Sequence, residues 1–487
     1  MFSQLLLNST STQTLNNFIS SNQLLIDEFA NLSIEDQRQQ ENLFQQFVLL
    51  GSRVQILDSL DFTQSTNRAF IAILFDYAER VNAIAAAVQL YQIIQKHHLG
   101  IGSRLEATML YMYNVPNNQV YVDRLGEICS KLQTAINEED DDDKRAVATF
   151  LNYYSSVVYN TAPHTQFVYD ILSKVNALSN TCHFLQNEDI QNSLLLDISQ
   201  PEAVYSTIQA TIDRLLGKQR RLTVIPTEEF IIEKNTDYAQ LLSNCQRRFD
   251  SIRDIAVSKL TEIQNSDEVF RSLGRGVAIL EQEEQLFSYL KSYGSMHKAK
   301  LLSSFSSFPF NEIMGKHIEI YDWSCGQALA TIVLLEYLGE KNIDLNIDRV
   351  TLIEPSEIAL KRASLHVKHF APEVRMRTVL KDMDSLEATD VNSLDESVKI
   401  HLFSNILDVE AYSMRHLVEI IKHGIKGNNY MICVSPYIND VKTARFDSFV
   451  NSFGAMSQFE ILFQDVAYRG QWINNWTKLI KTFKVKL

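Results

Sequence analysis

The sequence predicts two kinds of structure in one chain: an all-helical N-terminal region, followed by an α/β domain built on a mainly parallel sheet. Up to about residue 215, apolar residues recur at three- and four-residue spacing, which is typical of amphipathic helices. From about residue 316, short apolar runs of strand length alternate with helical segments. With only 15 glycines and 8 prolines in 487 residues, a loop-rich β protein is disfavoured. This length predicts two or three domains.

The helical region is predicted as a domain over residues 1–216. Alanines and tyrosines in the stretch AERVNAIAAAVQLYQII, which begins at Ala78, indicate closely packed helical hairpins. No fixed period repeats cleanly along the region, as a tetratricopeptide-like array would require. The clearest predicted helices are Asn67–Arg80, Asn82–His97, Arg104–Tyr113, Val120–Asn137, Lys144–Asn160 and Gln166–Leu178.

An acidic run, Glu138–Asp143, separates two of these helices. It is interpreted as a solvated loop that places negative charge at the N-terminus of the next helix, where the helix dipole favours it. The alternative is a divalent-cation site or a docking segment. Consecutive acids in a loop rarely converge on one ion.

The pattern breaks at 217–226, GKQRRLTVIP, where a basic cluster, a short β-like run and a proline indicate a domain junction. Residues 217–299 are predicted to form a helical connector and lid, with helices over Asp237–Gln264 and Ser266–Tyr293.

The α/β domain is predicted over residues 300–487. Alternating strands and helices indicate a parallel sheet with right-handed crossovers. The last two strands are separated by a polar stretch with two tryptophans and are expected to form an antiparallel hairpin at the sheet edge. The predicted strands are His317–Tyr321, Arg349–Ile353, Arg375–Leu380, Lys399–Phe403, Tyr430–Val434, Phe459–Asp465 and Thr482–Leu487.

The first strand leads into the most informative segment, IEIYDWSCGQALATIVLL, residues 318–335. Asp322 closes the strand, residues 323–328 form a turn of small residues, and Leu329–Tyr337 continue as an apolar helix. A strand, an acid, a tight turn and a helix N-terminus in this order can hold a nucleotide in α/β folds.

Polar side chains also end the next three strands. Glu354 ends the second strand and can accept both hydroxyls of a ribose. Asp382 and Asp384 follow the third strand, and Ser404 and Asn405 follow the fourth. Because the carboxyl ends of parallel strands share one edge, these side chains are expected to face one crevice.

These strand-end residues, in this order and spacing, resemble a class I S-adenosylmethionine-dependent methyltransferase domain over about residues 285–487. The resemblance implies a Rossmann-like sheet that ends in a reversed hairpin. It also implies that S-adenosylmethionine is the cofactor. The opening loop departs from the family pattern, because Ser324 and Ala328 stand where glycine is commonest and only Gly326 remains. Both replacements are small, so the backbone can still approach a ligand, though less freely.

The resemblance assigns the cofactor contacts residue by residue. It places Asp322 and the loop residues Ser324, Gly326 and Ala328 at the methionine end, and Glu354 on the ribose. It places Asp382 or Asp384 at the adenine and Asn405 near the sulfonium. Without the resemblance, Glu354 could cap the helix that begins at Pro355 and Ser356, and Asp384 could be a solvated loop residue.

A second group of residues precedes the first strand. Tyr293, His297 and Lys298 lie within about one and a half helical turns, and Gly294 allows a bend. Many methyltransferases of this class close such a helix over the cofactor. On that interpretation Tyr293 and His297 are catalytic, with His297 as general base for an accepting hydroxyl or amine. The alternative is a packing helix in which His297 and Lys298 face water.

The predicted function is S-adenosylmethionine-dependent methyl transfer to an unknown small-molecule or protein acceptor, with the helical region recognising substrate or partner. One alternative is a non-catalytic interaction or scaffold protein with a degenerate methyltransferase fold. Another is a nicotinamide-dependent oxidoreductase, but CGQALA lacks the three-glycine fingerprint. The SNILD segment also lacks the Asn/Asp-Pro-Pro-aromatic motif of enzymes that methylate DNA bases.

The composition of the chain disfavours some classes of partner and predicts the cellular compartment. The net charge of −14 disfavours broad binding to nucleic acid or to an anionic membrane surface. Five dispersed cysteines without CxxC spacing predict neither a zinc site nor a disulfide framework. Without a signal-peptide pattern or an apolar run of ~20 residues, a cytoplasmic location is expected.

Overall fold

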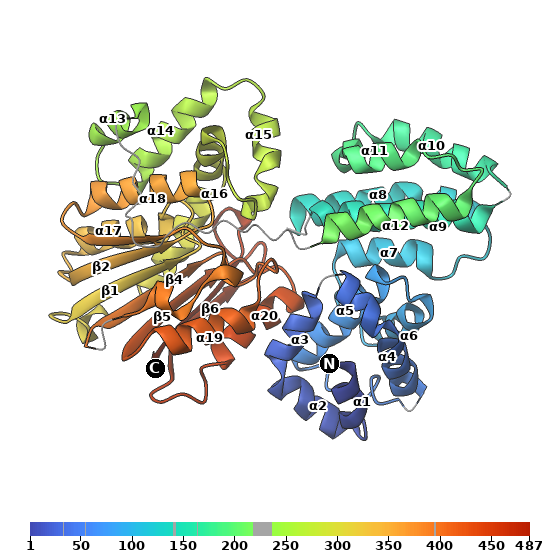
Figure 1. Cartoon of the computed structure of the whole chain (residues 1–487), viewed down its shortest axis with the longest axis horizontal. Coiled ribbons are helices and arrows are strands. Elements are labelled where there is room, and N and C mark those ends of the chain that lie inside the picture. The colour runs from blue at the N-terminus through green and yellow to red at the C-terminus, as the bar shows by residue number, and fades with distance from the viewer. Residues whose placement is uncertain (33, 54, 140–142, 163, 218–235, 394–395) are drawn as a thin grey trace. The chain divides into compact units, whose positions relative to one another are not determined.

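The structure is a computed structural model that describes residues 1–487 except 33, 54, 140–142, 163, 218–235 and 394–395 (Figure 1). The chain divides into two compact units. The first is Met1–Arg220 with Ile438–Ala444, and the second is Arg221–Tyr437 with Arg445–Leu487. Each unit is described by itself. Most of the predicted junction at 217–226 and part of the acidic run at 138–143 lie outside the described residues.

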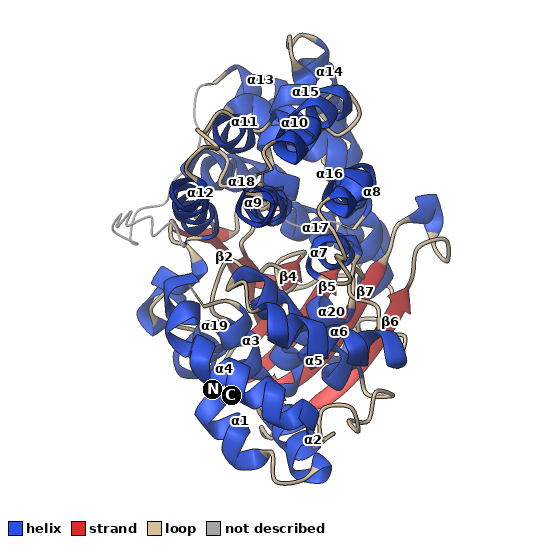
Figure 2. Ribbon diagram, turned by 90° about the vertical axis from the view of Figure 1, so that its right-hand side faces the viewer, coloured by secondary structure: helices blue, strands red, loops and turns tan. Residues whose placement is uncertain are grey.

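The N-terminal unit is helical throughout its described part, as the apolar spacing predicts (Figure 2). The six clearest predicted helices are confirmed to within two residues at each end. Local signals set several boundaries: Ser11 forms a capping box with Thr14, and Pro201 stands at the first position of its helix. The helices are α1 Phe2–Asn8, α2 Thr12–Ser21, α3 Gln23–Ala30, α4 Ile34–Arg53, α5 Ser65–Arg80, α6 Ile84–Lys96, α7 Ser103–Met112, α8 Gln119–Glu138, α9 Asp143–Thr161, α10 Gln166–Leu178, α11 Glu188–Leu194 and α12 Pro201–Leu216.

Two apolar clusters stabilise this unit. The first gathers aromatic side chains from α1, α3, α4 and α5, and the Phe2 ring lies 4.6 Å from that of Phe29. The second joins α8, α9, α10 and α12 around Phe150 and Tyr153. Buried alanines of α5 and α6 let those helices pack closely, as the alanine-rich stretch predicts.

The helices before the sheet differ from the prediction. The segment Asp237–Gln264 is two helices, α13 Asp237–Ser243 and α14 Phe249–Thr261. The predicted helix Ser266–Tyr293 is also divided, into α15 Ser266–Ser272 and the start of α16, Glu283–Phe305. Gly274 and Gly276 have positive φ values of 48° and 84°, which an α-helix cannot include, and Gln282 caps α16.

Within the described residues the sheet has seven strands in the order β3-β2-β1-β4-β5-β7-β6 (Figure 1). The first five strands are parallel, and β7 runs antiparallel to both β5 and β6. The predicted antiparallel hairpin at the sheet edge is therefore confirmed, with β7 beside β5 and β6 outermost. The strands are β1 His317–Trp323, β2 Asn346–Ile353, β3 Arg375–Val379, β4 Val398–Ser404, β5 Asn428–Ser435, β6 Glu460–Ala467 and β7 Lys478–Lys486.

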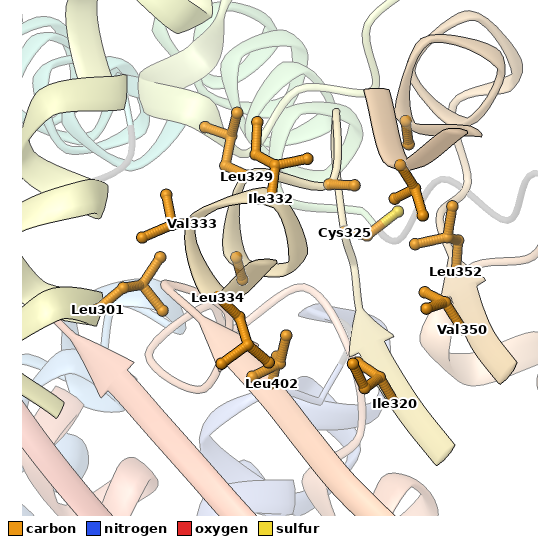
Figure 3. Close-up of a cluster of buried hydrophobic side chains, with 14 of the residues drawn as sticks. Leu301, Ile320, Cys325, Leu329, Ile332, Val333, Leu334, Val350, Leu352 and Leu402 are labelled. Atoms are coloured by element: carbon orange, nitrogen blue, oxygen red, sulfur yellow. The ribbon is translucent and has the colours of Figure 1, made fainter. Parts of the chain in front are cut away.

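Helices cover both faces of the sheet, as the Rossmann-like arrangement requires. On one face α17, Leu329–Lys341, packs against β1 and β4, and α18, Glu357–Phe370, packs against β2 and β3. Leu329, Ile332, Val333 and Leu334 of α17 belong to one core with Ile320, Leu352 and Leu402 of the strands, and Leu334 lies beside Leu402 (Figure 3). Figure 1 shows α19, Met414–Gly424, and α20, Asp440–Asn451, across the other face.

That other face carries a row of stacked rings. The His401 ring lies 5.1 Å from that of Tyr321, and the Trp323 ring lies 5.5 Å from that of Phe403. The Trp323 indole N–H donates to His401 Nδ1 at 3.1 Å. Burial lowers the pKa of His401 to about 4, so its ring is neutral and can accept this bond.

None of the helices in the described part of the chain has the length and apolar character needed to cross a membrane.

Candidate functional site

The loop between β1 and α17 keeps the backbone of a glycine-rich turn. Ser324, Gly326 and Ala328 have φ values of 48°, 53° and 59°, so three alternate residues are left-handed. For a residue with a Cβ this conformation costs about 1–2 kcal/mol. A loop free to relax would abandon such geometry at Ser324 and Ala328. Its retention at both positions indicates that the neighbouring structure fixes the shape of the turn.

Hydrogen bonds to the end of β2 and to α16 hold this loop. The Cys325 N–H donates to the Ile353 carbonyl at 2.9 Å, and the Gly326 N–H donates to Glu354 Oε2 at 2.9 Å. The side-chain amide of Gln327, which is 1% exposed, donates to the Leu286 carbonyl of α16 at 2.9 Å. The turn is therefore tied to the end of β2 and to α16.

Asp322 lies inside β1 rather than after it, since the strand continues to Trp323. Its carboxylate accepts from the N–H of Thr331 at 3.2 Å and from the Thr331 hydroxyl at 2.7 Å. Thr331 is in the first turn of α17, where free N–H groups and the helix dipole favour an acid. Asp322 thus joins strand to helix beneath the loop. Burial raises the pKa of Asp322 to about 7.

Glu354 follows β2 and connects two loops. Its Oε2 accepts from the Gly326 N–H, and its Oε1 accepts from the Ser356 N–H at 3.0 Å. The side chain of Ser356, not Glu354, caps α18 by accepting from the Ala359 N–H at 3.2 Å. Glu354 therefore shapes the edge of the first loop instead of serving as the helix cap. Burial raises the pKa of Glu354 to about 7.

These two raised pKa values predict a pH-dependent stability. A carboxyl group whose pKa is higher in the folded state contributes fully below about pH 4, and the contribution is lost as the pH rises through 7. For Glu354 the difference between pH 4 and pH 8 is about 3 kcal/mol. The unfolding free energy of Glu354→Gln should therefore fall by about 3 kcal/mol less than that of wild type between pH 4 and pH 8. Urea titrations followed by tryptophan fluorescence can measure it, since Trp323, Trp472 and Trp476 all lie in the C-terminal unit. Identical pH slopes for both proteins would contradict the prediction.

Asp382 and Asp384 are each held by a backbone N–H. Asp382 caps a short 3₁₀ turn, Met383–Ser385, by accepting from the Ser385 N–H at 2.8 Å. Asp384 is exposed and accepts from the N–H of Ser413 at 2.7 Å, at the start of α19. Both residues lie at the predicted edge of the sheet. Their hydrogen bonds organise the loops after β3 and β4.

Asn405 follows β4 in a left-handed conformation, with φ of 57°. Its N–H donates to the Val434 carbonyl at 2.7 Å, which fixes the loop against β5. Its side-chain oxygen accepts from Nζ of Lys300, which is fully buried on α16. Lys298 was among the residues singled out from the sequence, whereas Lys300 was not. The signal was present, since residues 293, 297 and 300 share one helical face.

Tyr293 and His297 also lie on this face of α16, because the helix continues through Gly294. His297 is 5% exposed, and its ring meets that of Tyr289 edge to face at 5.7 Å. Tyr293 is half-buried, with its ring 5.2 Å from that of Tyr289. Burial, and then the charge of Lys300, hold the pKa of His297 well below its usual range. The water-facing alternative for His297 is therefore wrong, and its ring is neutral at pH 7.

Lys298 lies on another side of the helix. Its ammonium group is 2.9 Å from Asp250 and 3.5 Å from Glu336, and it lies over the Phe249 ring. It fastens α16 to α14 and α17.

The site residues fit an S-adenosyl group in three respects. A Cβ built on Gly326 meets nothing within 4 Å, so there is room beside the loop backbone. Each Glu354 oxygen accepts one N–H, and a carboxylate oxygen has capacity for a second donor such as a ribose hydroxyl. The ammonium of Lys300 can balance an anionic group. Among the described residues, no group of three or more His, Cys, Asp or Glu side chains could hold a metal ion.

No family model and no curated protein matches the sequence. Solved structures give weak likenesses. The plantazolicin methyltransferase BpumL in complex with SAH is 12% identical, with a TM-score of 0.29 over 48% of this chain and 99% of that one. A putative class I S-adenosylmethionine-dependent methyltransferase from Listeria monocytogenes is 12% identical, with a TM-score of 0.29 over 76% of this chain and 89% of that one.

A TehB-like SAM-dependent methyltransferase from Corynebacterium glutamicum is 14% identical, with a TM-score of 0.22 over 46% of this chain and 97% of that one. Structural similarities with TM-scores this low give no evidence about function. The resemblance of the C-terminal unit to this family depends on its own strand order and strand-end residues.

Proposed function

We propose that this chain binds S-adenosylmethionine at the β1–α17 loop and transfers the methyl group to an acceptor. The observation that supports this most is the left-handed backbone at Ser324, Gly326 and Ala328, fastened to Glu354 through the Gly326 N–H. Two of these residues accept strain where glycine would avoid it. Left-handed non-glycine residues also occur at other turns, but these stand in alternate positions directly after β1, at the strand ends where open α/β sheets bind ligands.

The cofactor supplies an activated methyl group, so the protein has to bind, align and exclude water. In the proposal Glu354 accepts the ribose hydroxyls, and the backbone near Gly326 holds the methionine part. Lys300 pairs with the carboxylate of the methionine part, because a buried ammonium favours an anion. Asp382 or Asp384 would meet the adenine by accepting from its amino group.

His297 is proposed as a base on the acceptor side. It is neutral at pH 7, as a base must be, and shares a helix face with Tyr293. A low pKa makes it a weak base, so a proton that it takes passes on readily to water. The ring of Tyr293 would form one wall of the acceptor site.

The helical N-terminal unit is proposed to recognise the acceptor or a protein partner. It has its own two apolar cores. The scaffold alternative gives the same unit a role without catalysis, and predicts that the C-terminal unit binds no cofactor.

Calorimetry separates these functions. We expect S-adenosylmethionine to bind the full chain with a dissociation constant below about 1 mM, and NAD not to bind. Absence of S-adenosylmethionine binding at millimolar concentration would favour the scaffold alternative. Binding of NAD instead would favour the oxidoreductase.

Gly326→Ala should separate folding from binding. The added methyl group meets no atom within 4 Å, so the protein should fold at a cost of about 1 kcal/mol from the left-handed φ. In the proposed complex the methyl group would occupy the space of the cofactor, and affinity should fall by about tenfold or more. Ser324→Gly is the matched control, since it relieves strain and should stabilise the protein without weakening binding. Equal affinity of Gly326→Ala and wild type would place the cofactor elsewhere.

A further inference from the structure

A carboxylate near the end of β4 has no partner. Asp408 is 8% exposed, and its Oδ1 is shielded from solvent without a hydrogen bond. No residue in the described part of the chain donates to it or forms an ion pair with it. An unsatisfied buried acceptor is costly, more so when charged, and native proteins retain few of them. The unpaired carboxylate of Asp408 is therefore a candidate ligand-binding group.

The loop that carries Asp408 is firmly held, so the missing partner does not come from a poorly packed segment. The Asn405 N–H bonds the Val434 carbonyl of β5 at 2.7 Å. Arg445 donates to the carbonyls of Val409 at 2.9 Å and Tyr412 at 2.8 Å. The guanidinium thus holds the loop immediately after Asp408.

Asp408 belongs to the region of the proposed site. Desolvation, and then the nearby Tyr293, Glu354 and Asp408, raise the pKa of Tyr289, a half-buried residue of α16. The Tyr289 ring in turn lies against Tyr293 and His297. At the end of β5, the hydroxyl of Ser435 is also fully buried without a partner. The nearby cation, Lys300, donates to the side-chain oxygen of Asn405.

We propose that Asp408 is the acceptor-binding carboxylate and that the acceptor is an amine. This rests on the proposed methyl transfer. A buried, unpaired carboxylate is best compensated by a cationic donor, through a charge-assisted hydrogen bond. The rings of Tyr289 and Tyr293 also favour a cation over a neutral alcohol.

The chemistry balances without another reactant. Asp408 holds the bound ammonium by a charge-assisted hydrogen bond. The ammonium gives one proton to neutral His297, and the freed lone pair forms the bond between nitrogen and the methyl carbon. The bond from that carbon to sulfur breaks, and its electron pair stays on sulfur. The positive charge moves from sulfur to the product nitrogen, and the proton on His297 passes to water.

Asp408→Asn gives the first test, in a form that needs no ligand. Removing an unpaired buried charge should leave the melting temperature unchanged or raise it by about 2–4 °C. Asp390→Asn is the matched control, since Asp390 is 2% exposed and paired with Lys381 at 2.7 Å, and it should lower the melting temperature. If Asp408→Asn lowers the melting temperature as much as Asp390→Asn does, the proposal is overturned.

Benzylamine and benzyl alcohol, two probes of similar shape, give the second test. By calorimetry at pH 7.5 on the full chain, benzylamine should bind wild type about tenfold or more tightly than it binds Asp408→Asn. Benzyl alcohol should not distinguish the two proteins. Equal benzylamine affinity for both proteins, absence of benzylamine binding, or preference for benzyl alcohol would overturn the proposal.

S-adenosylhomocysteine in parallel titrations separates this inference from the proposed function. We expect it to bind wild type and Asp408→Asn alike. If it binds neither while benzylamine still distinguishes them, methyl transfer is wrong and the carboxylate is an amine site of another kind. If it binds both and benzylamine distinguishes nothing, the methyltransferase proposal stands and the amine assignment is wrong.

Discussion

Glu354→Ala should lower the affinity for S-adenosylmethionine by more than about 100-fold. The proposed complex uses Glu354 to accept two ribose hydroxyls, and each hydrogen bond to a charged acceptor contributes about 1.5–3 kcal/mol. The substitution also removes the acceptor of the Gly326 N–H, which shapes the loop. Calorimetry on the two proteins measures the affinity, and circular dichroism verifies that the variant is folded.

Glu357→Ala is the matched control for this prediction. Glu357 lies three residues further on, in the first turn of α18, and makes a surface ion pair with Lys361 at 2.6 Å. Such pairs contribute little, so affinity should be unchanged. Glu354→Gln keeps one acceptor oxygen, so its affinity for S-adenosylmethionine should lie between those of Glu354→Ala and Glu357→Ala. A loss of less than about threefold in Glu354→Ala would remove Glu354 from the ribose contact.

Asp76→Ala should destabilise the N-terminal unit by about 3–5 kcal/mol. Asp76 is shared by Arg80, Arg104 and Arg145 inside the helical packing. Burial alone would raise the pKa of Asp76, but the three guanidinium groups outweigh it and hold that pKa well below its usual range. The alanine variant would leave the three cations with less compensation.

Thermal unfolding followed by circular dichroism measures this loss. The control is Asp213→Ala, which breaks the exposed pair with Arg38 at 2.8 Å and should change the unfolding free energy by less than about 0.5 kcal/mol. Similar losses for the two variants would contradict the importance of the buried network. A second readout is pH: a lowered pKa means that the contribution of Asp76 is lost as the pH falls below about 4.

Much of the fold follows from local patterns in the sequence. Apolar spacing placed helices such as α10, Gln166–Leu178, at their observed bounds. Alternating runs predicted the strands, because buried parallel strands are short and continuously apolar. The acids and amide at the strand ends were predicted because parallel strands bring their carboxyl ends to one edge.

Features that depend on non-local packing were missed. Nothing in the local pattern indicated that β7 would lie between β5 and β6, since strand order is set by tertiary pairing. The connector helices were predicted too long, because apolar spacing continues across the breaks near residues 246 and 275. The partnerless state of Asp408 and the burial of Lys300 need three-dimensional structure. The sequence could suggest these residues only through their spacing.

A crystal structure of the full chain with S-adenosylhomocysteine tests the central claim most directly. The account predicts the ribose at Glu354, the amino-acid part beside Gly326 and Lys300, and the sulfur facing Asp408 and His297. The φ values at Ser324 and Ala328 should remain positive, as they are here. A ligand bound away from the β1–α17 loop, or no bound ligand at millimolar concentration, would contradict the account.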